Sequence, residues 1–258
     1  MRSARANRAP AYLESRRHFL LTLAVLFAAL WIPLAFKPND RSDWLLENAL
    51  LIAGIAVLVL SYRRLPLSKI SYAALFVFCC LHTIGAHYTY AQVPYDAAIQ
   101  ALTGHTLQET LGWQRNHFDR LVHFCYGLLL AYPIRELFLR VANVRGFWGY
   151  FLPLDVTMST SMLYELIEWG AAVFFGGDLG TAYLGSQGDV WDAQKDMAMA
   201  TLGAIICMCA TAAVNVRLQK DFARDWVDSL RVKDARPLGE EAVHRMRTAA
   251  RTSRKRKH

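Results

Sequence analysis

Acidic residues and histidines recur at helical spacing in this sequence. Asp119 is followed four residues later by His123, and Glu165 three residues later by Glu168. Two further pairs have a spacing of four residues: Asp43 with Glu47, and Asp192 with Asp196. Residues three or four apart share one face of an α-helix, so each pair can point into one pocket. Carboxylates and imidazoles gathered in a pocket can act as general acid and base, or can coordinate a divalent metal ion.

The segments that carry these residues are long and apolar. The chain is 54% hydrophobic and 19% charged, and its apolar residues form long blocks, a pattern that suits lipid better than a water-soluble core. A helix needs about 20 residues to cross the hydrocarbon core. Six blocks meet this requirement: His18 to Phe36, Leu45 to Tyr62, Ile70 to Tyr90, Phe118 to Leu139, about Phe151 to Phe175, and Met197 to Val216. The sequence therefore predicts an all-α, polytopic membrane helix bundle with about six transmembrane helices.

The first block has a signal peptide as its alternative interpretation, because Arg16 and Arg17 precede an apolar run. That run continues to Phe36, beyond the roughly 7 to 15 apolar residues of a signal peptide, and no small-residue cleavage site follows it. We therefore expect a transmembrane helix here.

Basic residues are distributed unevenly between the two sides of the predicted bundle. If the chain starts inside, 24 of its 29 lysines and arginines lie on the inner side. Five lie outside: Lys37, Arg41, Arg115, Arg120 and Lys195. This positive-inside bias places both termini in the cytoplasm. The net charge of +8 is thereby explained by topology, and no nucleic-acid partner is expected.

The chain divides into three parts on this reading. Residues 1–17 form a basic cytoplasmic segment, residues 18–217 the transmembrane domain, and residues 218–258 a basic cytoplasmic tail. Within the domain, a loop at about 91–117 is expected to fold on the outer face as a short interfacial helix or lid. Membrane lipids are the expected partners. The tail is interpreted as a solvated segment that fixes topology, with attraction to anionic lipid headgroups as the alternative.

Most ionisable residues of the apolar blocks fall in the outer half of the membrane. Burying charge in lipid costs at least about 2.5 kcal/mol per residue, so such groups usually face a bundle interior or a cavity. The expected counter-charges are Arg120, Lys195 or a protonated histidine. The acid–base candidates are His82, Asp119, His123, Glu165, Glu168 and Asp196. The candidate metal ligands are His82, His87, His123, Glu165, Glu168 and Asp192.

Three kinds of function can use this polar layer. The network can simply hold the bundle together in a structural or envelope-associated role, which is the first interpretation. It can instead be the site of an acid–base or metal-dependent enzyme acting on a lipid-linked or periplasmic substrate, or it can relay protons or cations in a transporter. Asp43 and Asp192 can also serve only to complement a helix dipole. No strict metal or nucleophile signature is present. A divalent metal is the one cofactor considered, because carboxylates and histidines can coordinate it.

The polar motifs resemble those of the YjdF family of bacterial inner-membrane proteins, whose function is unknown. The resemblance rests on five segments: Asp43 to Asn48, His82 to Tyr90, Asn116 to Phe124, Glu165 to Trp169, and Gly188 to Met197. A looser likeness to VanZ-like proteins rests on Asp119 with His123, then Glu165, then Asp192 or Asp196 before Gly203. The family resemblance implies a multi-pass protein of the bacterial cytoplasmic membrane and supplies no catalytic residues.

Overall fold

The computed structural model describes residues 8–177, 180, 184, 186–233, 239 and 243–249, with side chains described from Arg16 onward. Every regular element longer than one turn in this part of the chain is a helix. Six helices are long: α1 (Arg8–Leu34), α2 (Arg41–Ser61), α3 (Lys69–His87), α6 (Phe118–Val141), α7 (Trp148–Phe175) and α9 (Asp192–Leu218). Three are short: α4 (Tyr95–Thr103), α5 (Leu107–Leu111) and α10 (Phe222–Leu230).

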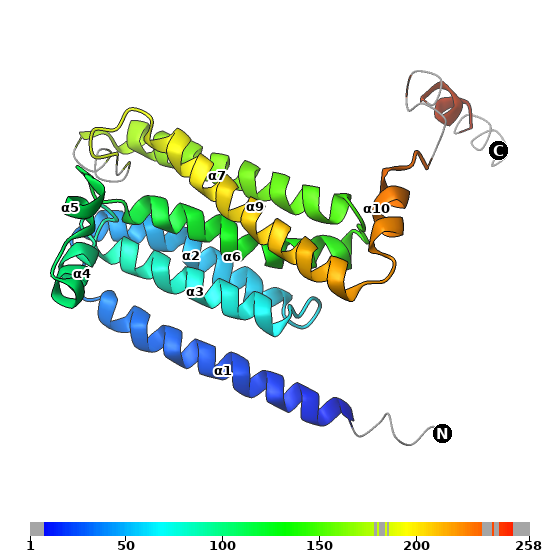
Figure 1. The fold of residues 1–258 in the computed structure, drawn as a ribbon, viewed down its shortest axis with the longest axis horizontal. Coiled ribbons are helices and arrows are strands. Elements are labelled where there is room, and N and C mark those ends of the chain that lie inside the picture. Colours follow the sequence, from blue (N-terminus) through cyan, green and yellow to red (C-terminus); the bar gives the residue numbers. More distant parts are fainter. Residues whose placement is uncertain are drawn as a thin grey trace, which may run out of the picture.

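The six long helices run alternately up and down, as Figure 1 shows. The start of α1 and the end of α9 lie at the same end of the bundle as α10, while α4 and α5 lie at the other end. Large apolar side chains face outward along these helices, among them Leu60 at 80% and Phe174 at 82% exposed. Such extensive exposed apolar surface is what a lipid-facing bundle presents. The predicted all-α polytopic membrane bundle is confirmed.

Five of the long helices have the length and apolar composition of a membrane span. The spans are Arg16–Leu34, Arg41–Ser61, Lys69–His87, Phe118–Val141 and Asp192–Leu218. The remaining long helix, α7, has 28 residues but also carries Asp155, Glu165 and Glu168, which dilute its apolar composition. It packs against both α6 and α9. The sixth span and the cytoplasmic position of both termini stay predictions.

Helices α6 and α9 make the closest contact in the bundle, and small residues allow it. A side-chain carbon at Gly127 would collide with the carbonyl oxygen of Ala200, and one at Gly203 with that of Phe124. Small residues of this kind let membrane helices approach until their backbones touch. Because α6 and α9 start at the same end of the bundle, this crossing brings the first turns of the two helices side by side (Figure 1).

The opposite end of the bundle is closed by aromatic packing. Phe222 and Trp226 of α10 pack against Tyr150 on α7, with ring centroids 6.1 and 5.8 Å from it. The hydroxyl of Tyr150 accepts a hydrogen bond of 2.6 Å from Asn215 near the end of α9. These contacts join α7, α9 and α10 at this end of the bundle.

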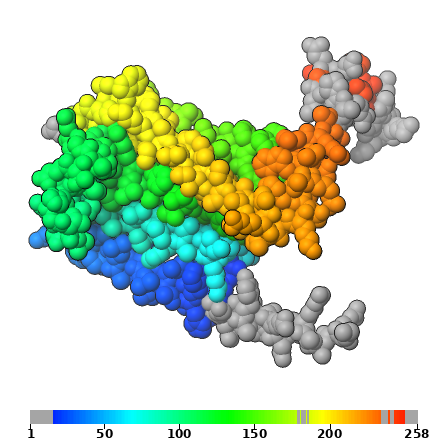
Figure 2. Space-filling view, viewed as in Figure 1, coloured from blue at the N-terminus to red at the C-terminus, as the bar shows by residue number. Residues whose placement is uncertain are grey.

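The segment between α3 and α6 folds over the other end of the bundle. It forms α4 and α5, and both cover this end in Figure 2. The amide of Asn116 donates to the carbonyl of Val93 (2.9 Å), and the Tyr95 hydroxyl accepts from the backbone of His117 (3.0 Å). The end of the basic tail, residues 250–258 with Arg254 to Lys257, lies outside the described residues.

Candidate functional site

Three helices contribute ionisable side chains to one point near the α4 and α5 end of the bundle. Helix α6 supplies Asp119 and His123 from its first two turns, α7 supplies Glu165, and α9 supplies Asp196. The Nε2 atom of His123 lies 3.6 Å from Asp119 Oδ1 and 3.4 Å from Glu165 Oε1. One ligand atom each of Asp119, His123 and Asp196 lies within 4.8 Å of the others. We call these four residues the acid cluster.

The acid cluster contains carboxylate oxygens without hydrogen-bond partners. Glu165 is 9% and Asp196 2% exposed, yet Glu165 Oε1 and Asp196 Oδ1 each accept no hydrogen bond. Leaving a buried polar atom without a partner costs about 1 to 3 kcal/mol, and more if it is charged. Three carboxylates around one imidazole therefore call for a proton or a cation to offset their charge.

A second group of charged residues, three basic and two acidic, lies next to the acid cluster and forms several ion pairs. Arg115 forms an ion pair with Asp192, and Arg120 Nη2 lies 2.5 Å from Asp189 and 3.2 Å from Asp192. Lys195 Nζ lies 2.7 Å from Asp189. We call these five residues the outer latch, because they tie the segment before α6 to the segment before α9. The Lys195 ammonium and the Arg120 guanidinium hold the pKa of Asp189 well below its usual range.

Of the expected counter-charges, a histidine lies beside Glu165, while the two basic residues pair elsewhere. Arg120 and Lys195 pair with Asp189 and Asp192, whereas Glu165 faces His123. The one link between the two groups is Arg120, whose Nε lies 3.9 Å from Asp196 Oδ1 and makes no hydrogen bond. The arginine therefore places a positive charge at the edge of the acid cluster without saturating it.

His82 belongs to a neighbouring hydrogen-bond network. Its Nδ1 lies 2.5 Å from the hydroxyl of Tyr90, and its Nε2 lies 3.2 Å from the backbone oxygen of Glu47. The buried carboxylate of Glu47 accepts a hydrogen bond of 2.9 Å from Tyr164 on α7. Both ring nitrogens of His82 already have partners, which leaves neither free for a metal ion.

The other predicted ligands also lie outside the three-residue metal group. His87 Nδ1 lies 2.7 Å from the carbonyl oxygen of Leu34, so its ring ties the end of α3 to the end of α1. Asp192 is occupied by the outer latch, and Glu168 is one turn further along α7 than Glu165. Asp119 and Asp196 join His123 in the group instead, although the sequence had suggested them only as acid or base. The four-residue spacing of Asp119 and His123 in the sequence indicated that these two residues lie together.

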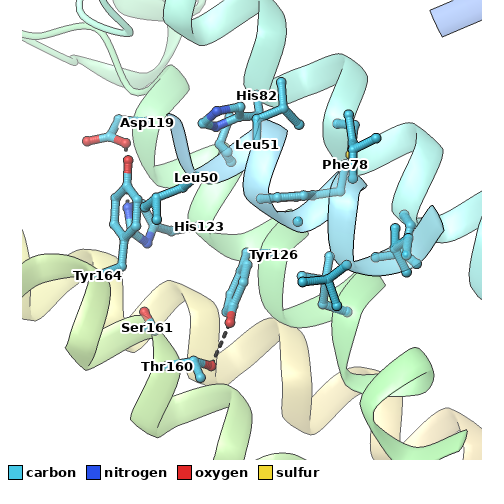
Figure 3. A pocket seen from close by; sticks show the side chains of 18 of the residues that line it. Leu50, Leu51, Phe78, His82, Asp119, His123, Tyr126, Thr160, Ser161 and Tyr164 are labelled. Atoms are coloured by element: carbon cyan, nitrogen blue, oxygen red, sulfur yellow. Dashed lines mark hydrogen bonds and ion pairs between the residues drawn. The ribbon is translucent and has the colours of Figure 1, made fainter. Parts of the chain in front are cut away.

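Sequence reasoning missed two polar residues at the site. Tyr164 contacts the acid cluster through its ring, which lies 5.9 Å from that of His123, and Figure 3 shows its hydroxyl pointing toward Asp119. Arg115 reaches Asp192 across 77 residues of sequence. Neither residue has a motif that marks it, because its role depends on packing between distant segments.

The acid cluster borders a hollow of about 470 Å³, which we call the chamber. Figure 3 shows His82, Asp119 and His123 at one end of it, with Phe78 and Tyr126 farther along. The walls come from α2, α3, α6 and α7 and consist mostly of apolar side chains. The lining residues are Leu50, Leu51, Gly54, Ile55, Val57, Leu58, Leu75, Phe78, Cys79, His82, Tyr90, Asp119, Val122, His123, Tyr126, Leu130, Thr160, Ser161 and Tyr164.

A second hollow, of about 340 Å³, lies on the other side of the acid cluster. It is lined by Glu165 and Trp169 of α7 and by Asp189, Asp192 and other residues at the start of α9. Apolar side chains such as Met162 and Leu166 also line this hollow, but its acidic residues make it more polar than the chamber, and we call it the polar hollow. The acid cluster borders both hollows, with Glu165 on the polar hollow and Asp119 and His123 on the chamber.

The long apolar helices and buried ionisable layer define a polytopic α-helical membrane protein. A family model described as "Predicted membrane protein (DUF2238)" matches residues 19–217, and the chain belongs to this family. It is 36% identical over 204 residues to the inner membrane protein YjdF of Escherichia coli (strain K12), covering 79% of this chain and 93% of that protein. No solved structure matches the chain significantly. These findings confirm the YjdF-type family and the inner-membrane location; the VanZ-like resemblance stays a prediction.

Proposed function

We propose that this protein is a membrane-embedded enzyme that binds one divalent metal ion at Asp119, His123 and Asp196 and uses it for acid–base chemistry. The unpartnered Oδ1 of Asp196 is the observation that carries the proposal, because the residue is only 2% exposed and has a carboxylate oxygen within 4.8 Å of ligand atoms of His123 and Asp119. A buried carboxylate of this kind is normally paired or coordinates a metal.

The donor set suits a small number of metals. Two donors bound to one ion at about 2.0 to 2.2 Å each lie at most roughly 4.4 Å apart, so the observed group within 4.8 Å needs only a small closure. One imidazole with two carboxylates fits Zn²⁺ or Mn²⁺, whereas Cu⁺ prefers sulfur ligands and Mg²⁺ prefers oxygen alone. We expect Zn²⁺ or Mn²⁺.

Glu165 and Arg120 have complementary roles in this proposal. The carboxylate of Glu165 lies beside His123 and lines the polar hollow, so it can accept a proton from a water molecule that enters from that side. Arg120 can stabilise negative charge that develops on a substrate next to Asp196. The metal, when bound, would polarise a carbonyl or phosphoryl group or lower the pKa of a water.

The two rival functions are less well supported. A purely structural role leaves Glu165 Oε1 and Asp196 Oδ1 unexplained, because buried carboxylate oxygens in a structural network usually accept hydrogen bonds. A proton or cation pathway needs polar residues on both sides of the midplane, and in α7 the other half offers little beyond Asp155. The distant VanZ-like resemblance rests on the same acidic and histidine residues, although it names no reaction.

The proposal is tested by the metal content of the purified protein. After incubation with Zn²⁺ or Mn²⁺ and removal of the excess, elemental mass spectrometry should find about one ion per chain. Asp196→Asn keeps the size of the side chain but removes the charge, and we expect it to lower metal affinity at least 100-fold.

The matched control is Asp189→Asn, which removes an acidic group from the outer latch and should leave one ion bound. Both variants are checked for folding by size-exclusion chromatography in detergent. If the wild-type protein binds neither ion while all three proteins fold equally well, the metal proposal is wrong and the structural role is favoured.

A further inference from the structure

The acidic and histidine side chains that line the chamber lie at one end of it, whereas Tyr126, Thr160 and Ser161 supply only hydroxyl groups farther along. On α6, Asp119 and His123 line one end, and Leu130 lines the other. Asp119 and Leu130 are eleven residues apart, which corresponds to about 16 Å along a helix that rises 1.5 Å per residue. The chamber is therefore elongated along the bundle and changes from polar to apolar along its length.

The chamber also contains real empty space beside α2. A side-chain carbon built at Gly54 meets no atom within 4 Å. Leu50 and Val57, which flank Gly54 on the same helix, are 43% and 64% exposed. Helix α2 packs mainly against α3, and Tyr164 joins it to α7 through Glu47 at the polar end. The wall between α2 and α7 is thus open toward the lipid.

A chain of methylene groups matches these features. An apolar hollow does not hold water, because water needs two to four polar partners. A volume of about 470 Å³ lies within the roughly 300 to 1,000 Å³ range of small-molecule sites. At membrane depth, the molecules that combine a hydrocarbon chain with a polar head are amphiphiles of the bilayer itself.

We propose that the chamber binds the hydrocarbon chain of a single-chain amphiphile, or one chain of a larger lipid, with the polar head held against Asp119 and His123. The proposal rests on the proposed function and names its substrate class as lipid-linked rather than soluble. The chain enters sideways between α2 and α7, and the head reaches the acid cluster. Water then reaches the head from the polar hollow that Glu165 lines.

The test uses a lysophospholipid that carries a diazirine halfway along its chain. Wild-type protein in lipid nanodiscs is irradiated, and the labelled residues are identified by peptide mass spectrometry. We expect labelling of chamber residues such as Leu50, Tyr126 and Leu130, saturable by unlabelled lysophospholipid. Glycerol phosphate, which has the head without the chain, should not compete at the same concentration.

A substitution that fills the chamber gives the discriminating comparison. Gly54→Phe places a ring into the empty space, and we expect it to reduce chamber labelling at least tenfold. Gly170→Phe is the matched control, because Gly170 on α7 also has no atom near a built side-chain carbon but does not line the chamber. This control should label like the wild type.

Two results would overturn the inference: labelling that is spread over outward-facing residues such as Val59, or chamber labelling that Gly54→Phe leaves unchanged. Metal content is measured on the same samples, which separates the two proposals. Saturable chamber labelling in a protein that binds no metal would contradict the metal proposal and leave the lipid proposal standing. One bound metal with no saturable labelling would remove the lipid proposal alone.

Discussion

The outer latch and the acid cluster are neighbours that treat buried charge in opposite ways. In the latch, two aspartates face Arg115, Arg120 and Lys195, and Asp189 lies 2.5 Å from Arg120 and 2.7 Å from Lys195. In the acid cluster, three carboxylates face one histidine, at 3.4 and 3.6 Å for the two measured pairs. Arg120 belongs to the latch and reaches the cluster only at 3.9 Å.

This difference separates a structural arrangement from a functional one. Once two opposite charges are buried together, each stabilises the other, and removing one partner raises the free energy of the folded state. Groups left without partners raise it, and they are retained where the site needs them for another purpose. Removing one acid from each region should therefore change stability in opposite directions.

The largest expected effect comes from the latch. Asp192→Ala leaves Arg115 without its nearest partner and weakens the pairing of Arg120, while their side chains are only 11% and 15% exposed. Breaking a buried pair costs about 3 to 5 kcal/mol. For a chain of this size this corresponds to a drop of about 6 to 12 °C or more in the unfolding temperature, measured in detergent by intrinsic fluorescence.

An exposed ion pair elsewhere provides the control for this prediction. Asp221 and Arg224 lie 3.4 Å apart, with side chains 63% and 70% exposed. Asp221→Ala should change stability by less than about 1 kcal/mol, as is usual for surface pairs. Equal effects of the two substitutions would show that the latch does not stabilise the bundle.

A smaller effect of opposite sign is expected in the acid cluster. In metal-free protein, Asp196→Asn replaces a buried charge that lacks a donor with a neutral amide, and we expect the unfolding free energy to rise by about 1 kcal/mol. The measurement is the same thermal unfolding, performed after chelation. A clear loss of stability would mean that Asp196 is already paired in the folded protein, and the contrast with the latch would disappear.

Helical spacing predicted part of this comparison from the sequence. Asp119 and His123 meet because residues four apart on a helix share a face, and nothing else in the fold is needed for that. Hydropathy and charge placement predicted that Glu165 and Asp196 lie at similar depth, and the structure places both in the acid cluster. The six apolar blocks also correspond to the six long helices, although α1 begins ten residues before its block and the other ends differ by up to about five residues.

Other features depended on packing that spacing does not encode. Asp192 and Asp196 have the same spacing as Asp119 and His123, yet Asp192 pairs with arginines while Asp196 joins the acid cluster. The register of α6 against α9, which Gly127 and Gly203 allow, decides this division. The chamber likewise depends on four helices at once, and a single glycine such as Gly54 gave no sign of it.

The smallest expected effect concerns the pH dependence of the latch. Lys195 and Arg120 lower the pKa of Asp189 below its usual value of 3.8. A carboxyl with a depressed folded-state pKa contributes stability that is complete above the unfolded pKa and is lost as the pH falls toward the folded one. The stability difference between the wild type and Asp189→Asn should therefore stay constant from about pH 7 to about pH 5 and shrink only below about pH 4. Unfolding temperatures of both proteins across this range provide the measurement. If the stability difference already shrinks near pH 6, the latch does not lower the pKa of Asp189. Asp189 would then resemble the carboxylates of the acid cluster, which Arg120 reaches only at 3.9 Å.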